Sequence, residues 1–456
     1  MIVMKFGGSS VESAAAIERV AGIVKARLER RPVVVVSAMG RTTNKLLAMA
    51  ADAVGGRTGE ALRQLQDLRE FHLHEASAVV SDADWPKAQS VIEAHFTELV
   101  ELLKGLAVLG ELSPRSIDAI SSYGERLSSA IIALAFRRFG MDTAHVDSRD
   151  VIVTDDRHTQ ASPIYSITYA RISEVLLPLA AEKVVVMGGF IGSTETGVTT
   201  TLGRGGSDFT ASIVGAGAGA EEIQIWTDVD GMLTCDPTIL PGGHRVKTIS
   251  FAEAAELAYF GAKVLHPSTV LPAIEKNIPV LIVNSRNPEV EGTRIIAESI
   301  PCRNVVKSIA CKRNITVVNI HSTRMLMAYG FLHRIFEVFD RYETPVDMVS
   351  TSEVGVSLTI DNRQKLDAIC SELRQFSEVA TEEKQVIVCL VGDNIRYTPG
   401  VAARAFRALE RINIRMISQG GSRLNLSCVI AEQDLVEAVR ALHEEFFSEV
   451  DPAVFA

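Results

Sequence analysis

"MKFGGSS", residues 4–10, places a lysine, two glycines and two serines directly after a short apolar start. Residues 2–4 are typical of a β-strand, and a helical pattern follows over residues 14–28. The two glycines allow a tight turn between them. Such a turn directs backbone N–H groups and a helix N-terminus at one point, where an anion is stabilised, and Lys5 adds a positive charge. The stretch predicts either a phosphate-binding turn or an ordinary glycine turn of an α/β protein.

Two further strands are predicted in the first three hundred residues. PVVVVSAMG (residues 32–40) and KVVVMGGFIG (residues 183–192) are apolar, mainly β-branched runs that end in glycine. Such runs are typical of strands buried on both faces of a parallel sheet. Between them, from about Asn44 to Phe139, the sequence is helical and poor in strands, which predicts a helical insertion or lid. The alternation of strands and helices predicts an α/β fold.

The C-terminal part contains an internal repeat. Residues 330–360 align with residues 400–430, an offset of 70 residues. In each copy a strand leads to a glycine, a helix with Phe336 or Phe406, and two more strands, which predicts two related βαββ units. Such paired units either bind a ligand at their shared edge, mediate dimerisation or pair for structural reasons alone. The boundary with the preceding region is expected near residues 299–308.

Length, composition and charge limit the class of protein. A chain of 456 residues predicts two to four domains, and 47% hydrophobic with 22% charged residues is typical of a globular protein. A net charge of −10 argues against nucleic acid or an anionic membrane as the main partner. The six cysteines show no metal-binding spacing. The N-terminus has no apolar leader and no run of eighteen apolar residues occurs, so we expect a cytoplasmic protein.

Two polar segments carry candidate substrate-binding residues. TTLGRGGSDFTAS (residues 200–212) lacks the spacing of a P-loop or a dinucleotide fingerprint, but it offers Arg204, whose planar fork suits a carboxylate, and Asp208. The alternative is a helix-capping turn with a surface arginine. SSYGERLSSAI (residues 121–131) predicts Glu125 at the start of an amphipathic helix, where a carboxylate is stabilised electrostatically even without another role.

Two more segments carry candidate nucleotide-binding residues. WTDVDGMLTCDP (residues 226–237) lacks the bidentate glutamate and the spacing of a calcium loop, and it predicts instead a nucleotide-binding edge at the end of a strand. YFGAKVLHP (residues 259–267) places Lys263 after a glycine. A lone lysine of this kind is more often a solvated charge.

Taken together, the motifs KFGGSS, VVVVSAMG, YGERLSS, GFIG, TTLGRGGSD, WTDVDG and FGAKVLHP resemble, in order and wording, those of the aspartate kinases of the amino-acid kinase superfamily. The resemblance extends from Met4 through both C-terminal repeats, which are similar to that family's ACT domains. It implies an α/β fold: a parallel-sheet amino-acid kinase domain (residues 1–300) with a helical insertion (about 44–139), followed by two α+β ACT-like (βαββαβ) domains (309–384 and 385–456).

The resemblance also implies a reaction, the transfer of the γ-phosphoryl group of Mg-ATP to the β-carboxylate of L-aspartate, with ATP and Mg²⁺ as cofactors. Both reactants are anions, so positive charge is needed where they meet. Arg204 would bind the α-carboxylate and Glu125 the ammonium group of aspartate. Asp208 would hold the lysines in place, because a carboxylate nucleophile has no proton to lose at neutral pH. The implied residues are Lys5 and Asp208 for catalysis, Ser37, Thr43, Glu125, Arg204 and Ser207 for aspartate, and Lys5, Gly7, Gly8, Ser9, Thr227, Asp228 and Lys263 for ATP.

Two positions depart from the family pattern. Thr238 follows Asp236 and Pro237 where the family usually has an arginine, and Leu233 stands where many relatives have tyrosine. We expect weaker ATP binding than in relatives, with the chemistry intact.

The segments RMLMAYGFL (residues 324–332) and PVDMVSTSE (residues 345–353) most resemble the lysine-sensitive, monofunctional class. They imply feedback inhibition by L-lysine at an ACT–ACT interface between chains, in a homodimer and possibly a tetramer. Pro345 replaces a serine of some relatives, so threonine or no effector stays open, and an exposed polar loop is the structural alternative. The implied effector residues are Met325, Phe331, Leu332, Val346, Asp347, Ser352 and Glu353.

Two rival functions remain. The first is a kinase of the same superfamily that acts on a glutamate derivative or carbamate, although Arg204 and Glu125 favour a free α-amino acid. The second is a catalytically impaired amino-acid sensor with the same fold. Lys5, Asp208 and Lys263 argue against the sensor, because amino-acid sensing does not require that charged set.

Overall fold

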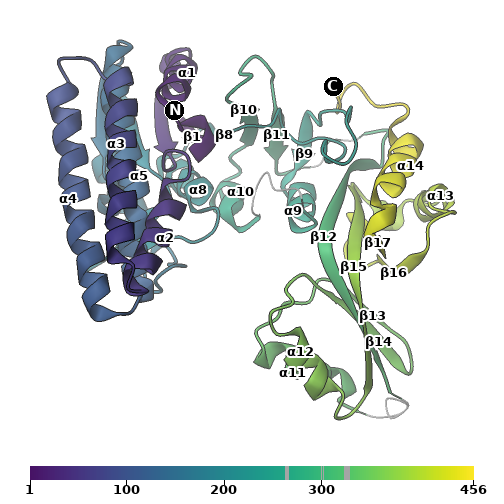
Figure 1. Cartoon of the computed structure of the whole chain (residues 1–456). Coiled ribbons are helices and arrows are strands. Elements are labelled where there is room, and N and C mark those ends of the chain that lie inside the picture. Colours follow the sequence, from purple (N-terminus) through teal and green to yellow (C-terminus); the bar gives the residue numbers. More distant parts are fainter. Residues whose placement is uncertain (262–266, 299, 301, 323–328) are drawn as a thin grey trace. The chain divides into compact units, whose positions relative to one another are not determined.

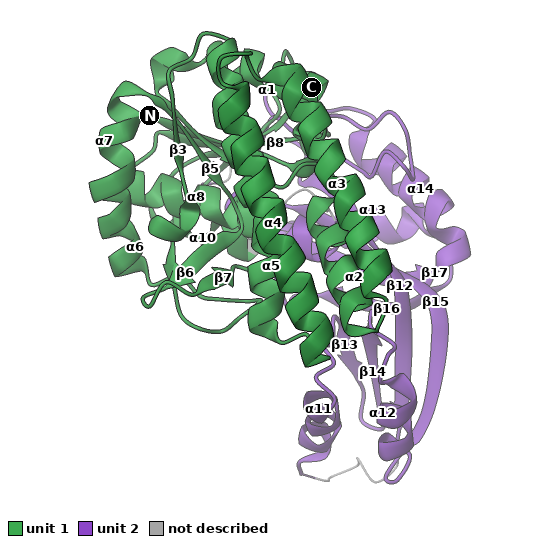
Figure 2. Ribbon diagram, turned by 60° about the vertical axis from the view of Figure 1, so that its left-hand side comes forward, with its two compact units in different colours: residues 1–232, 265–297 green, residues 233–264, 298–456 purple. Residues whose placement is uncertain are grey.

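The computed structural model describes residues 1–456 except 262–266, 299, 301 and 323–328 (Figure 1). The chain divides into two compact units (Figure 2): residues 1–232 with 265–297, and residues 233–264 with 298–456. The first unit therefore contains every candidate kinase residue of the sequence except Lys263, which lies outside the described residues.

The first unit is built on a sheet with the strand order β3-β5-β2-β1-β8-β10-β11. Neighbouring strands are parallel except β10 and β11, which are antiparallel. The predicted strands at the N-terminus and in both apolar runs are confirmed, and β2 and β5 are buried along their whole length, as expected for central strands of a parallel sheet. The strands are β1 (Ile2–Phe6), β2 (Pro32–Val36), β3 (Thr143–Val146), β5 (Val184–Gly188), β8 (Glu222–Thr227), β10 (Val280–Asn284) and β11 (Thr293–Ile296).

The predicted helical insertion is confirmed as four helices that lie side by side (Figures 1 and 2). One apolar core joins them to β1 and β2, and it includes Met4, Val34, Leu68 and Phe136. The helices are α2 (Thr42–Val54), α3 (Thr58–Val79), α4 (Trp85–Leu109) and α5 (Pro114–Arg138). The other helices of the unit are α1 (Ala14–Lys25), α6 (Tyr165–Arg171), α7 (Leu177–Glu182), α8 (Gly206–Ala218) and α10 (Leu271–Glu275).

A small second sheet has the order β4-β6-β7 and precedes the loop at residues 202–205. Its strands are β4 (Val153–Thr154), β6 (Ile191–Thr194) and β7 (Thr199–Thr201). Because β7 ends at Thr201, this sheet delivers the chain to Arg204 and then to α8.

The second unit contains a sheet with the order β13-β14-β12-β15-β17-β16. Its two long strands, β12 and β15, run antiparallel from the pair Val306 and Gly392 to the pair His321 and Glu378. Each long strand therefore serves both repeats, and the two repeats form one continuous sheet. The strands are β12 (Val306–His321), β13 (Val349–Thr351), β14 (Gly355–Ile360), β15 (Glu378–Gly392), β16 (Ile414–Gln419) and β17 (Asn425–Ala431).

Helices follow the strands of each repeat in the predicted order. The first repeat has α11 (Phe331–Arg341) and α12 (Leu366–Leu373), and the second has α13 (Val401–Ala408) and α14 (Leu435–Phe447). The first of the two strands predicted after the helix of the first repeat is short in the structure, because β13 begins only at Val349. Just before β13, two backbone hydrogen bonds with Thr359 take the place of a regular strand ladder. Asp347 N–H donates to the Thr359 carbonyl oxygen, and Thr359 N–H donates to the Met348 carbonyl oxygen.

A buried ion pair anchors α9 (Phe251–Tyr259), which follows β9 (Thr248–Ser250), to β12. The Glu253 carboxylate accepts hydrogen bonds from the backbone and hydroxyl of Ser250 at the N-terminus of the helix. Lys307 Nζ lies 3.0 Å from Glu253 Oε1 and 3.1 Å from Oε2, and both side chains are fully buried. Two buried charges stabilise each other, and removing one leaves the other buried without a counter-ion. We therefore expect the loss of either residue to lower the free energy of unfolding strongly.

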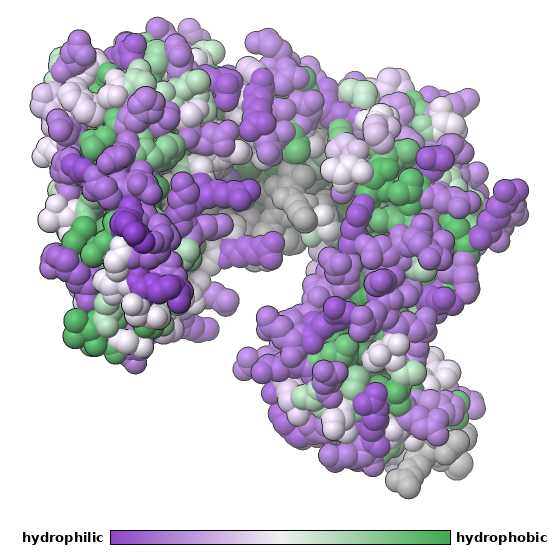
Figure 3. Space-filling model, in the orientation of Figure 1, coloured by the Kyte–Doolittle hydropathy of each residue, from purple (hydrophilic) through white to green (hydrophobic). Residues whose placement is uncertain are grey.

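The face of the molecule shown in Figure 3 is mainly polar. Hydrophilic residues predominate there on each unit, and apolar residues form small groups among them. None of the described helices combines the length and the apolar character needed to cross a membrane.

Candidate active site

The candidate site lies at the carboxyl ends of the parallel strands in the first unit. β1 and β8 are neighbours there, with β2, the next strand along the chain after β1, on one side of the pair and β10, a later strand than β8, on the other. Such a change of direction leaves a crevice at the carboxyl ends, which is where open α/β sheets bind ligands.

The turn after β1 packs tightly against the segment after β2. Gly7 N–H donates to the Trp226 carbonyl oxygen over 3.2 Å, and Gly40 N–H donates to the Gly8 carbonyl oxygen over 3.1 Å. A Cβ atom on Gly8 would lie only 2.8 Å from the Gly40 oxygen, so a side chain would push the two segments apart. Ser9 lies in the same turn, a 3₁₀ segment over Gly8–Ser10. The glycine turn predicted from the sequence is therefore present, and it brings the segments that follow β1 and β2 into close contact.

Lys5 and Asp208 form an ion pair at the centre of the site. The distance from Lys5 Nζ to Asp208 Oδ1 is 2.7 Å, and the side chains are 12% and 15% exposed. Asp208 lies in the first turn of α8, where the helix dipole also stabilises its charge. The helix begins directly after Gly205, whose φ of 72° is a left-handed conformation that favours glycine. The structure thus brings together the two residues for which the resemblance implied a catalytic role.

Glu125 is also in this site, but its place in the helix differs from the prediction. α5 begins at Pro114, so Glu125 lies in the middle of a long helix and not at its N-terminus. Gly124 does not end the helix; it permits close packing, because a Cβ atom there would lie 2.7 Å from Ala38 Cβ. The helix dipole therefore does not explain the position of Glu125.

The Glu125 carboxyl group is buried and only partly hydrogen-bonded. Oε1 accepts the Ala38 N–H over 3.2 Å, whereas Oε2 has no hydrogen-bond partner among the described residues. Burial raises the pKa of Glu125 to about 8, although the Ala38 N–H and the positive charge of Lys5 act in the opposite direction. The group is therefore suited to a cationic ligand that would compensate its charge.

Ser37, Thr43 and Ser207 complete the walls around these charges. The Ser37 hydroxyl donates to Ser207 Oγ over 3.1 Å, and Thr43 lies in the first turn of α2. Together they surround a cavity of about 310 Å³, which is the size of a small metabolite. It is lined by Lys5, Ser37, Thr43, Glu125, Phe190, Gly203, Gly205, Gly206, Ser207 and Asp208.

Phe190 is a cavity residue that the sequence analysis missed. It has a φ of 67°, which is rare for a residue with a bulky side chain. A Cβ atom on Gly206 would lie 2.7 Å from its ring, so the ring and the start of α8 are in close contact. The sequence signal that could have identified Phe190 is its position in GGFIG, after two glycines and directly before an apolar strand.

Arg204 and the nucleotide candidates border the cavity or lie at the same sheet edge. Arg204 is exposed and lies between two glycines of the lining, with its side chain outside the lining itself. Thr227 ends β8, and its hydroxyl donates to Asp228 Oδ1 over 3.2 Å. Since the Gly7 N–H bonds to the carbonyl of Trp226, these residues and the glycine turn share one edge.

In the second unit, the predicted effector residues are only partly brought together. Asp347 Oδ1 accepts Lys312 Nζ over 2.5 Å, and burial raises the pKa of Asp347 while Lys312 opposes that rise. Ser352 and Glu353 are exposed in the turn after β13, whereas Asp347 precedes β13, so the two acidic residues flank opposite ends of that strand.

The apolar effector candidates differ in exposure. Phe331 is buried in the core of the first repeat, Val346 packs against that core, and Leu332 is 40% exposed. Met325 lies outside the described residues.

The chain is similar to known proteins over nearly its whole length. Residues 1–284 match the amino acid kinase family and residues 388–446 match an ACT domain. Aspartokinase 2, chloroplastic, of Arabidopsis thaliana is 39% identical over 469 residues, which cover 99% of this chain and 85% of that protein. Lysine-sensitive aspartokinase 3 of Escherichia coli is 36% identical over 457 residues, which cover 98% of this chain and 99% of that protein.

Solved structures give the same result. E. coli aspartokinase III in complex with lysine and aspartate (T-state) matches with a TM-score of 0.85 at 35% identity, over 98% of this chain and 99% of that chain. The same enzyme in complex with aspartate and ADP (R-state) matches with a TM-score of 0.84 at 35% identity, over 98% of this chain and 100% of that chain.

Proposed function

Because this chain belongs to the aspartokinases, within the amino acid kinase family, we propose that it transfers the γ-phosphoryl group of Mg-ATP to the β-carboxylate of L-aspartate. The products are 4-phospho-L-aspartate and ADP, and the reaction is the first step of lysine, threonine and methionine biosynthesis. The observation that carries the proposal is the Lys5–Asp208 ion pair in one cavity with the buried Glu125 carboxyl group.

In the proposed reaction, an oxygen of the aspartate β-carboxylate attacks the γ-phosphorus. The bond from that phosphorus to the oxygen bridging to the β-phosphate breaks, and ADP leaves with the electron pair. No proton has to be removed from the nucleophile, so the site needs no general base. Lys5 stabilises the negative charge on the transferring group, and Asp208 holds the ammonium of Lys5 in position over 2.7 Å.

Aspartate is proposed to bind through its two other charged groups. The ammonium group pairs with Glu125, which lines a cavity of suitable size and whose buried Oε2 has no hydrogen-bond partner among the described residues. The α-carboxylate pairs with Arg204, an exposed residue whose sequence neighbours Gly203 and Gly205 line the cavity. Ser37, Thr43 and Ser207 complete the pocket. This arrangement leaves the β-carboxylate free for the reaction.

ATP is proposed to bind along the sheet edge at the glycine turn. Gly7 and Gly8 offer backbone close to Lys5: a Cβ atom on Gly7 would lie 3.7 Å from Lys5 Nζ, so a phosphate oxygen has room there. The remaining proposed contacts are Ser9, Thr227, Asp228 and Lys263. Mg²⁺ is part of the nucleotide substrate; within the described residues, no group of three His, Cys, Asp or Glu side chains is placed to hold a metal ion.

Thr238 is expected to weaken ATP binding relative to the family. Its N–H and hydroxyl both donate to Asp236 Oδ1, over 2.8 and 2.7 Å, and the residue is exposed. Thr238→Arg would restore a cation for the phosphates, so we expect a lower KM for ATP with kcat unchanged. Steady-state kinetics at saturating aspartate measure both values, and an unchanged KM for ATP would contradict this interpretation.

L-Lysine is proposed as the allosteric inhibitor, bound by the first repeat at an interface between two chains. The support is the E. coli relative, which is named lysine-sensitive, and the acidic residues Asp347 and Glu353. Homodimerisation through the ACT domains is supported by β13, an edge strand of the sheet whose three residues are all exposed. A tetramer and a cytoplasmic location stay predictions from the sequence.

Hydroxamate formation tests the function directly. The purified chain is incubated with L-aspartate, hydroxylamine, ATP and Mg²⁺, without effector, with L-lysine or with L-threonine. We expect aspartyl hydroxamate in the absence of effector, and suppression by L-lysine but not by L-threonine. No turnover, together with calorimetric binding of lysine, would contradict the kinase and support the amino-acid sensor.

A further inference from the structure

A second buried carboxylate, Asp118, lies on the same helix as Glu125 but outside the cavity. It is fully buried, seven residues before Glu125 in α5. Two turns of helix separate the two side chains, about 10 Å along the axis and on nearly the same face. Asp118 plays no part in the reaction proposed above.

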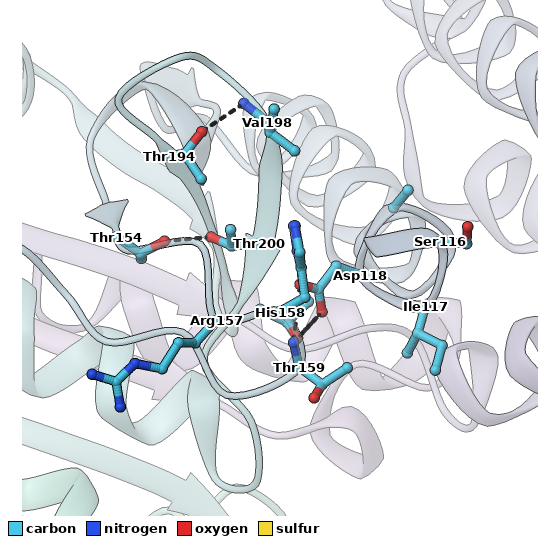
Figure 4. A network of polar contacts seen from close by, with 12 residues as sticks. Ser116, Ile117, Asp118, Thr154, Arg157, His158, Thr159, Thr194, Val198 and Thr200 are labelled. Atoms are coloured by element: carbon cyan, nitrogen blue, oxygen red, sulfur yellow. Dashed lines mark hydrogen bonds and ion pairs between the residues drawn. The ribbon is translucent and has the colours of Figure 1, made fainter. Parts of the chain in front are cut away.

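Donors from two separate segments converge on this carboxylate, and Figure 4 shows the first of them, His158 and Thr159, beside Asp118. His158 Nδ1 lies 2.7 Å from Oδ2, and the Thr159 N–H donates to both oxygens over 3.0 Å. The Thr201 hydroxyl, at the end of β7, donates to Oδ1. Thr159 has a φ of 71°, a strained conformation for a β-branched residue. The hydrogen bonds to Asp118 hold the backbone in that conformation.

Both segments are in contact with the loop that carries Arg204. Thr201 precedes Arg204 by three residues, and its carbonyl oxygen accepts the Ala161 N–H over 2.9 Å. A Cβ atom on Gly203 would lie 3.1 Å from the Thr159 carbonyl oxygen, so the strained turn packs directly against a residue that lines the cavity. Asp118 therefore ties the helix of Glu125 to the loop of Arg204.

We infer that Asp118, through Thr201 and His158, is a positioning residue that sets the separation between Glu125 and Arg204 and thereby the affinity for the amino-acid substrate. The inference rests on the proposed roles of these two residues at the ammonium and α-carboxylate groups. A free α-amino acid has a fixed distance between those groups, so a small displacement of the loop weakens both contacts. The nucleotide candidates that the structure describes lie at the ends of β1 and β8, away from the residues of this link.

Neighbouring threonines in β7 provide a matched test. Thr201→Val removes the donor to Asp118 and keeps the shape of the side chain, and Thr201→Ser restores the hydroxyl. Thr200→Val is the control, because Thr200 is equally buried and loses a bond of the same kind, to Thr154 Oγ1 over 2.7 Å (Figure 4). His158→Ala is a second variant that removes a donor from the loop side, in case Thr201→Val does not fold.

Steady-state kinetics with aspartate and ATP varied separately give the readout. For Thr201→Val we expect the KM for aspartate to rise about tenfold, which corresponds to about 1.4 kcal/mol, with the KM for ATP and kcat within about twofold of the wild type. Thr201→Ser should recover the wild-type KM for aspartate, His158→Ala should shift it in the same direction as Thr201→Val, and Thr200→Val should leave it in place.

Three results would overturn the inference: an unchanged KM for aspartate in Thr201→Val and His158→Ala, a parallel rise in both KM values, or an equal effect of Thr200→Val. A wild-type chain without turnover on aspartate would instead overturn the proposed function, and the inference with it. The wild-type arm thus distinguishes the two failures.

Discussion

Replacing Glu125 with glutamine tests the ammonium site through its pH dependence. Burial raises the pKa of the Glu125 carboxyl group to about 8 in the chain without substrate, so at pH 7 only about a tenth of the molecules carry the charge that an ammonium group needs. Substrate binding must then release a proton. We therefore expect the KM of the wild type for aspartate to fall roughly tenfold between pH 7 and pH 9.

The variant Glu125→Gln has no charge to gain in this range. Its KM for aspartate should be independent of the ionisation of residue 125, and at pH 9 it should exceed the wild-type value by roughly 10- to 100-fold, since a hydrogen bond between charged groups contributes about 1.5–3 kcal/mol. The difference should shrink as the pH falls, because the wild type loses its own charge.

The ionisation of Glu125 also affects the stability of the fold, in the opposite direction. Raising the pH favours aspartate binding, but it destabilises the folded chain without substrate. A carboxyl group whose pKa is higher in the folded than in the unfolded chain destabilises the fold as the pH rises from about 4.5 to about 8. Glu125→Gln removes that penalty, so the melting temperature of the chain without substrate should be higher in the variant than in the wild type at pH 8. Thermal unfolding followed by circular dichroism measures this difference.

The assay is ADP production at saturating ATP from pH 6 to pH 9. Glu98→Gln is the control, because Glu98 lies on the adjacent helix α4 with its side chain 56% exposed. The Glu98→Gln variant should show the same dependence of the KM for aspartate on pH as the wild type. A wild-type KM for aspartate that stays constant within twofold between pH 7 and pH 9, or a glutamine variant with the same slope, would refute the reasoning.

Three further substitutions address other parts of the chain. Asp208→Asn should lower kcat about 100-fold with a smaller change in the KM for aspartate, since Lys5 Nζ loses its partner at 2.7 Å; single-turnover kinetics would contradict this if the chemical step were unchanged. Gly8→Ala should lower the melting temperature, because its Cβ atom would lie 2.8 Å from a carbonyl oxygen, and normal thermal stability would count against the close contact. Lys307→Met should cost about 3–5 kcal/mol of unfolding free energy in urea, because Glu253 keeps a buried charge without its counter-ion, and a loss below 1 kcal/mol would disprove that account.

The contrast between Gly8 and Gly124 shows where sequence reasoning succeeds. Next to Gly8, an apolar strand and a downstream helical pattern mark a turn, and the structure confirms that order of elements. Gly124 has the same local signal as a helix boundary, yet α5 runs through it from Pro114 to Arg138. Its small size serves a contact with Ala38, a residue far away in the sequence, and such a requirement leaves no local pattern.

The sequence by itself determined the order of strands and helices, the helical insertion and the repeat. These features follow from hydrophobic periodicity and from segments whose residues are close together along the chain. The roles of Lys5 and Asp208 in one site were implied only by the resemblance to the aspartate kinases. Only the tertiary structure decided the burial that raises the pKa of Glu125, the place of Phe190 in the cavity and the convergence of Thr159 and Thr201 on Asp118. Burial and hydrogen bonding depend on groups that the fold brings together from distant segments, so no pattern along the chain records them.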